Sequence, residues 1–348
     1  MAEKKAVNKV VEPTNEEIDA HVDQLVAKAQ VALSKFEEFT QEQVDYIVAK
    51  CSVAGLDAHG TLAEAAVNET GRGVFEDKAV KNLFACEYVT SNLRHLKTVG
   101  IINEDPLLGI TEIAEPVGVV CGIVPTTNPT STVIFKSLIC LKTRNPIIFS
   151  FHPSAHACSV MAAVVIRDAA IAAGAPEDCI QWLDLKSMYA TTALMKHPGV
   201  ATILATGGNA MVAAAYSCGK PALGVGAGNV PAYVEKTCVL PRAVNDIVLS
   251  KSFDNGMICA SEQAAIVDTE IYDAFMKEIK RFKVYFVNKE EKAKLETFMF
   301  GAVAYSDNVN AAKLNPNVVG KPATWIAEQA GFKVPEDTQI ICAECKEV

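Results

Sequence analysis

Strand-like and helix-like segments alternate through the middle of the chain, and this alternation restricts the possible folds more than any other feature. The run 117–124 is almost continuously apolar, as in a strand that is buried on both faces. Further short strands are predicted at 146–151, 179–183 and 200–204, with helices at 130–141, 155–173 and 188–196. Such an order indicates a parallel sheet with crossover helices, in the Rossmann manner.

The predicted elements on either side of this region are of other kinds. Capping-box sequences at 14–17 and 40–43 predict two long helices in the N-terminal part. Residues 110–115 alternate apolar and polar side chains, which is typical of an exposed strand or hairpin. After the central region, helices are predicted at 241–252 and 271–282 and a strand at 263–267.

Composition argues against several classes of function. The formal charge of -9 disfavours nucleic acid and anionic membranes as partners. The first residues have charges without an apolar stretch behind them, and the longest apolar segment, 159–175, contains Arg167 and Asp168, so neither a secretory signal nor a membrane span is expected. Eleven cysteines without regular spacing indicate reduced thiols in the cytoplasm.

Cys259 is the strongest candidate for a catalytic residue. It follows an Asn-Gly turn at 255–256 and precedes a predicted strand, so it can project from a loop into a cleft. A thiolate in that position can attack a carbonyl carbon and form a covalent intermediate. Isolated cysteines are far more often buried and inert, so the surrounding sequence has to decide between the two interpretations.

Asn128 and two glycine-rich segments are further candidates. Asn128 stands where a strand ends and a helix begins, so its side chain can cap the helix or donate to an oxyanion. The turn 206–208 leads from a strand into a helix and can hold a phosphate, or it is an ordinary turn. Alternating glycines at 224–228 are unusual in a regular strand and suggest that the backbone passes close to a ligand or a neighbouring element, or bends.

Four segments in order resemble the CoA-acylating aldehyde dehydrogenase half of bifunctional aldehyde–alcohol dehydrogenases. These segments are 123–132 with 135–145, 203–208, 219–229 and 253–263. The resemblance implies an α/β aldehyde dehydrogenase fold. It implies a Rossmann-like cofactor domain at 1–103 and 117–236, a bridging or oligomerisation hairpin at 104–116, and an incomplete catalytic α/β domain at 237–348. A complete domain of this family continues past Val348 and precedes an iron-dependent alcohol dehydrogenase half, so no alcohol formation is expected.

The resemblance also implies roles for individual residues. Cys259 is expected to be the nucleophile, and Asn128 the oxyanion donor together with the backbone N–H of Cys259. His152 stands where many relatives have lysine, on the adenosine side. The implied cofactor-binding residues are Thr126, His152, Pro153, Thr206, Gly207, Gly208, Gly224 and Gly226.

The implied reaction is the reversible conversion of acetyl-CoA and NADH to acetaldehyde, CoA and NAD⁺, without a metal. Hydrolytic aldehyde dehydrogenases have a glutamate base in the segment matching 223–231, whereas no acidic residue occurs here from Gly219 to Tyr233. Without a base to activate water, the acyl-enzyme survives until CoA takes it. The resemblance further implies a cytoplasmic homo-oligomer, forming filaments in the full-length enzyme.

Three alternatives stay open at this point. A hydrolytic aldehyde dehydrogenase is disfavoured by the missing glutamate. An inactive module that acts only in assembly would associate without binding NADH. A metal-binding protein built on the cysteines lacks suitable spacing, because Cys342 and Cys345 form a lone C-x-x-C pair.

Overall fold

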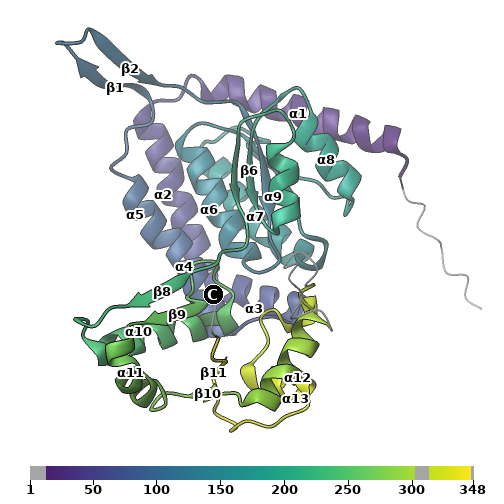
Figure 1. Ribbon diagram of the computed structural model, residues 1–348. Helices are drawn as coiled ribbons and strands as arrows, with labels where there is room; N and C mark the ends of the chain where they lie inside the picture. The colour runs from purple at the N-terminus through teal and green to yellow at the C-terminus, as the bar shows by residue number, and fades with distance from the viewer. Residues whose placement is uncertain (1–12, 302–312, 346–348) are drawn as a thin grey trace, which may run out of the picture.

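Five parallel strands form the central sheet of the computed structural model, which describes residues 13–301 and 313–345 (Figure 1). The ends of the expected domain ranges, at 1 and 348, therefore lie outside the described residues. The strand order is β5-β4-β3-β6-β7. The strands are β3 (Val119–Val124), β4 (Ile147–Phe151), β5 (Ile180–Trp182), β6 (Val200–Thr206) and β7 (Ala222–Val225).

The order of the strands reverses between β3 and β6. The chain runs outward from β3 through β4 to β5 and then returns to the other side of β3 with β6. All six residues of β3 are buried, because helices cover both faces of the sheet. This arrangement confirms the predicted Rossmann-like sheet, and in such sheets ligands bind where the strand order reverses.

Helices cover both faces of the sheet. One face carries α1 (Asn15–Phe36), α8 (Met188–Lys196) and α9 (Asn209–Tyr216). The other carries α2 (Gln41–Asp57), α6 (Pro129–Lys142) and α7 (His156–Ala172). Both predicted capping boxes are present, with the Thr14 and Thr40 hydroxyls accepting from the backbone three residues ahead.

The segment Pro153–Ala172 is long and apolar enough to cross a membrane by composition alone. In the structure its helical part, α7, packs against α2 and α6 in the core. Ala162, Ala163 and Ile166 are fully buried there. The apolar side chains of this helix are therefore explained by its packing in the core.

Four helical segments follow α2 in the N-terminal part. They are α3 (His59–Thr70), α4 (Phe75–Leu83), a π-helix (Phe84–Tyr88) and α5 (Val89–Leu93). The next element is an antiparallel hairpin of β1 (Gly100–Asp105) and β2 (Ile110–Ala114), which projects from the molecule (Figure 1). Its first strand begins at Gly100, whereas the hairpin was expected from residue 104. Most side chains of both strands are exposed, so buried and exposed residues do not alternate along them.

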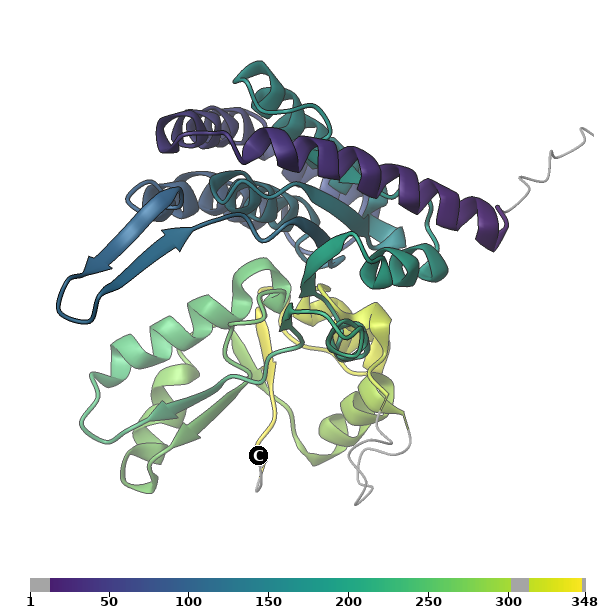
Figure 2. The same ribbon diagram turned by 90° about the horizontal axis from the view of Figure 1, so that it is seen from above.

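A second α/β unit follows the sheet and appears in green and yellow in Figure 2. It contains two parallel strand pairs, β8 (Pro231–Val234) with β9 (Ala264–Val267) and β10 (Val284–Phe286) with β11 (Ile340–Cys342). Its helices are α10 (Leu240–Ser252), α11 (Tyr272–Ile279), α12 (Lys289–Phe300) and α13 (Ala323–Ala330). Because β8 pairs with β9, this unit begins before the expected boundary at residue 236.

Candidate functional site

The carboxyl ends of β3, β4 and β6 lie side by side and gather several of the candidate residues. In the register of the sheet, Val124 pairs with Phe151 and Ile123 pairs with Ala205. Asn128 follows β3, His152 follows β4 and Thr206 ends β6. These side chains therefore originate along one edge of the sheet, beside the reversal of strand order.

Cys259 lies exposed in a turn after the short helical segment η3 (Phe253–Gly256). The backbone of Gly228 passes so close that a Cβ at this position would overlap the carbonyl oxygen of Cys259. The Gln263 side chain donates to the Gly228 carbonyl at 2.8 Å, and the Gln263 N–H donates to the Val230 carbonyl at 2.8 Å. The alternating glycines suggested close passage past a ligand or a neighbouring element, or a bend. At Gly228 the structure shows close passage past the Cys259 loop.

Asn128 does not cap the helix that it precedes. Helix α6 begins with Pro129 as expected, but the Asn128 side chain makes no capping hydrogen bond. Its Oδ1 atom instead accepts from the Lys81 ammonium group at 2.7 Å. The same ammonium group donates to the Met257 carbonyl at 3.3 Å, two residues before Cys259. Lys81 thus connects the Asn128 loop to the Cys259 loop.

Asp254 anchors this connection from the interior. Its carboxylate is fully buried and forms ion pairs with Lys81 and, at 3.1 Å, with Lys78. Its second oxygen accepts from the Val74 N–H at 2.7 Å. These contacts hold Asp254 and Asn255 in the left-handed backbone region, with φ of 50° and 52°. Burial lowers the pKa of Lys81 to about 8, although the neighbouring Asp254 carboxylate opposes that shift.

The turn between β6 and α9 offers backbone donors. The Thr206 hydroxyl donates to the Ile123 carbonyl at 3.0 Å, and the Gly207 N–H donates to the Val225 carbonyl at 3.2 Å. Within the described residues, the N–H groups at 208–210 make no hydrogen bond. A Cβ at Gly208 would meet nothing within 4 Å, so the turn has open space at Gly208.

Gly224 and Gly226 both pass close to a neighbouring element, which is one of the options that the alternating glycines left open. Gly224 lies within β7, where a Cβ would come within 2.6 Å of Val212 and 2.8 Å of Tyr216. Its lack of a side chain lets α9 pack on the strand. A Cβ at Gly226 would lie 2.6 Å from Asn209 Oδ1. A role of either glycine in cofactor binding stays a prediction.

His152, Pro153 and Thr126 lie at the same edge of the sheet. His152 precedes a short 3-10 helix, η2 (Pro153–Ala155), and its Nδ1 atom accepts from the Ser154 N–H at 3.2 Å. Partial burial, and then the charge of Arg72, lower the pKa of His152. The Thr126 hydroxyl is buried and has no hydrogen-bond partner among the described residues, so it can serve a ligand.

Sequence interpretation missed four charged residues that organise this region. Lys78, Lys81 and Asp254 were not recognised, although lysines three apart share one face of a helix. Lys136 was missed as well. It is almost fully buried and donates to the carbonyls of Ile123 and Leu204, each at 2.6 Å, where the strand order reverses. Burial lowers the pKa of Lys136 to about 7.

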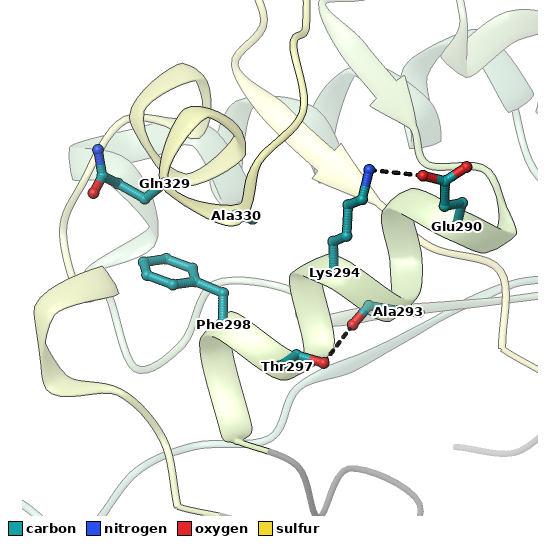
Figure 3. Close-up of a pocket in the computed structure, with 7 residues that line it drawn as sticks. All are labelled: Glu290, Ala293, Lys294, Thr297, Phe298, Gln329 and Ala330. Atoms are coloured by element: carbon teal, nitrogen blue, oxygen red, sulfur yellow. Dashed lines mark hydrogen bonds and ion pairs between the residues drawn. The ribbon is translucent and has the colours of Figure 1, made fainter.

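A separate pocket of about 430 Å³ lies between α12 and α13 and contains none of the candidate residues (Figure 3). It is lined by Glu290, Ala293, Lys294, Thr297, Phe298, Gln329 and Ala330. Lys294 and Glu290 form an ion pair of 2.7 Å at its rim. The C-x-x-C pair that was considered for a metal site includes Cys342, which lies in β11. Within the described residues, no three His, Cys, Asp or Glu side chains are grouped so that they could hold a metal ion.

Comparison with known proteins gives consistent matches. The family model described as "Aldehyde dehydrogenase family" matches residues 3–312. The aldehyde-alcohol dehydrogenase 2 of Entamoeba histolytica is 70% identical over 333 residues, which cover 95% of this chain and 38% of that protein. The chain therefore spans well under half the length of this relative.

Two solved structures have similar folds. The acetylating aldehyde dehydrogenase of Geobacillus thermoglucosidasius is 45% identical with a TM-score of 0.90, over 97% of this chain and 73% of that one. The propionaldehyde dehydrogenase of Rhodopseudomonas palustris with bound propionyl-CoA is 31% identical with a TM-score of 0.80, over 93% of this chain and 70% of that one.

Proposed function

Because the chain belongs to the aldehyde dehydrogenase family, we propose that it catalyses the CoA-acylating step, the reversible conversion of acetyl-CoA and NADH to acetaldehyde, CoA and NAD⁺. The observation that carries this proposal is the link between Asn128 and the Cys259 loop through Lys81. An exposed thiol and an amide donor on loops joined by one side chain are the pair of groups that acyl transfer requires.

In the proposed reaction the Cys259 sulfur attacks the thioester carbon of acetyl-CoA, and CoA leaves as its thiolate. The Asn128 amide and the Cys259 N–H donate to the oxyanion that forms on the carbonyl oxygen. NADH supplies the hydride that reduces the resulting acyl group on Cys259. The C–S bond to Cys259 then breaks, which releases acetaldehyde and returns the thiolate, while one proton from solvent balances the reaction.

For NAD(H), the proposed binding residues surround the reversal of strand order. The open space at Gly208 and the free N–H groups at 208–210 suit a pyrophosphate, which helix N-termini bind through such donors. The unpartnered Thr126 hydroxyl is a further donor at this edge. His152 and Pro153 are proposed for the adenosine side, and Gly224 and Gly226 for close backbone approach.

The proposed organisation places the cofactor on the central sheet and the thiol on the second unit. The hairpin exposes Leu107, Leu108 and Ile113, which suits a bridging role in a homo-oligomer. The filament and the cytoplasmic location come from the resemblance alone. No nucleic acid, membrane or metal is part of the proposal.

The proposal is tested by measuring NADH oxidation with acetyl-CoA for the chain and for Cys259→Ala. We expect oxidation that is lost in the variant, and an acetyl group on Cys259 detected by peptide mass spectrometry when NADH is omitted. Equal rates for both proteins would exclude Cys259 as the nucleophile. Rapid hydrolysis of the acetylated thiol without CoA would favour the hydrolytic alternative.

A further inference from the structure

Two lysines on α4, Lys78 and Lys81, lie inside the protein and have no part in the reaction as described above. We propose that Lys81 is a positioning residue that acts through Asn128, fixing the carbonyl side of the amide so that its NH₂ side donates to the oxyanion. This inference rests on the proposed function, because it deepens the role assigned there to Asn128.

The chemistry of lysine determines which way the Asn128 amide faces. An ammonium group has three donors and no acceptor, so the atom 2.7 Å from the Lys81 nitrogen has to be the amide oxygen. The NH₂ group then points away from Lys81. None of the hydrogen bonds in the described part of the chain uses that NH₂ group, so it remains available for a substrate oxygen.

The three donors of Lys81 have three acceptors. Besides Asn128 Oδ1, these are the Asp254 carboxylate and the Met257 carbonyl at 3.3 Å. One ammonium group therefore fixes the position of the amide relative to the loop that carries Cys259. Lys78 supports the same arrangement, because it donates to the Thr127 carbonyl at 3.1 Å as well as to Asp254.

The charge of Lys81 also strengthens the amide as a donor. A hydrogen bond from an ammonium group to the carbonyl oxygen polarises the amide and increases the positive character of its N–H groups. The charged groups around Lys81 are Lys78 and Asp77 on α4 and Asp254 on η3, and the Phe253 ring lies 5.8 Å away. Since the pKa of Lys81 is about 8, this polarisation decreases above that pH.

Acylation and alkylation of Cys259 separate this role from a merely structural one. Attack of the thiol on p-nitrophenyl acetate or acetyl-CoA creates an oxyanion, whereas alkylation by iodoacetamide does not. The ratio of the two rates at Cys259, followed by peptide mass spectrometry, therefore cancels changes in thiol reactivity. We expect Lys81→Met to lower this ratio by about 10²-fold, as loss of an oxyanion donor does.

Lys81→Met is expected to fold, because Lys78 still neutralises the buried Asp254 carboxylate. The matched control is Lys142→Met, which removes another buried lysine that pairs with Asp45 away from the site. That variant should leave the ratio unchanged. If Lys81→Met does not fold, Lys81→Gln tests the charge of Lys81 alone, since it keeps a donor to Asn128. It should lower the ratio through the lost polarisation, and an unchanged ratio would contradict the role of the charge.

Combination with Asn128→Ala tests whether Lys81 acts through Asn128. The expected result is that Lys81→Met has no further effect on the ratio once Asn128 is alanine. An undiminished effect in that background would overturn the proposal. Lys81→Arg should restore the ratio and keep it constant up to about pH 10, whereas the wild-type ratio falls above about pH 8, because arginine retains its proton.

Comparison of p-nitrophenyl acetate, an ester, with acetyl-CoA, a thioester, separates failure of the Lys81 proposal from failure of the proposed function. Reaction of the wild-type chain with p-nitrophenyl acetate but not with acetyl-CoA would contradict the proposed CoA chemistry while the Lys81 test still proceeds on the ester. Alkylation without acylation by either compound would overturn the Lys81 proposal itself, because no oxyanion would then be stabilised at Cys259.

Discussion

The backbone of Gly228 lies directly against the carbonyl group of Cys259, with no room for a side chain between them. Gly228 follows the last strand of the central sheet, and Cys259 belongs to the second unit. The Gln263 side chain closes the same contact with its hydrogen bond of 2.8 Å to Gly228. The cofactor-side sheet and the thiol loop are therefore held together by backbone contact as well as by Lys81.

Gly228→Ala is expected to displace the Cys259 loop. The new Cβ would overlap a backbone oxygen, so one of the two segments has to shift. Misplacement of a reacting group by about 1 Å costs about 10²-fold in rate, and we expect a loss of acyl transfer of that order with little change in thermal stability. The measurement is acetylation of Cys259 by acetyl-CoA alongside the melting temperature.

The control for this substitution is Gly60→Ala, since a Cβ at Gly60 in α3 would meet nothing within 4 Å. Since Gly60 is only the second residue of the helix, we expect stability to change by no more than about 0.5 kcal/mol and acetylation to stay unchanged. Normal acetylation in Gly228→Ala would show that the contact has no influence on the thiol.

Asp254→Ala is expected to destabilise the protein where α4 packs against the Cys259 loop. Removal of this buried carboxylate leaves Lys78 and Lys81 without their counter-ion, and breaking a buried pair in this way costs about 3–5 kcal/mol in the free energy of unfolding. Urea unfolding measures the change. Glu290→Ala removes an exposed ion pair with Lys294 and should change the free energy of unfolding far less, because solvent screens that pair. Similar losses for both variants would contradict the anchoring role of Asp254.

The sheet was predictable because its local signals agree with its tertiary environment. The continuous apolar run at β3 is buried on both faces, and the predicted helices between the strands are all present. Strands of three or four residues are too short for a period to show, so their prediction is uneven: β5 and β9 were predicted, whereas β8, β10 and β11 were missed. Gly224 lies in a strand, although alternating glycines are unusual there, and its lack of a side chain allows the close passage past Tyr216 that the sequence suggested.

The candidate site was predictable only in part. Cys259 and Asn128 came from a loop position and a resemblance, and sequence spacing could not show how their loops are connected. The connection runs through Lys81, which lies 47 residues before Asn128 and 173 before Asp254. A lysine in an amphipathic helix ordinarily faces solvent, so the sequence offered no reason to place Lys81 in the interior. Its burial is explained by the buried Asp254 carboxylate, which the structure places against it.

Alkaline pH is expected to destabilise the protein from about pH 9 upward. Burial raises the pKa to about 12 for six thiols, those of Cys51, Cys86, Cys121, Cys140, Cys158 and Cys179. Between about 9 and 12 the unfolded chain has lost protons that the folded chain keeps. The free energy of unfolding therefore falls by up to about 1.4 kcal/mol per pH unit for each thiol.

Lys81 and Lys136 oppose this trend. Their pKa values are lowered to about 8 and about 7 in the folded chain, so up to the ordinary lysine pKa the unfolded chain holds protons that the folded chain has lost. Over that range these two lysines make the free energy of unfolding rise with pH. Two such groups do not outweigh six thiols above about pH 9. Urea unfolding under reducing conditions at several pH values measures the slope. Cys179→Ala should reduce the slope by the contribution of one buried thiol, whereas Cys345→Ala, which removes an exposed thiol, should not reduce it. A free energy of unfolding that does not change with pH in this range would contradict the role of the buried thiols.

Gly208→Val is expected to weaken NADH binding without disturbing the fold. Its backbone has φ of -66° and ψ of 155°, which valine adopts readily, and its Cβ would enter open space. Loss of glycine at this capping position costs at most about 1 kcal/mol of stability. The added methyl groups would occupy the open space at this turn, where the pyrophosphate is proposed, so we expect the dissociation constant for NADH to rise by about tenfold or more. Fluorescence titration with NADH measures it, with Gly60→Ala as the control. An unchanged constant would mean that the pyrophosphate does not lie at this turn.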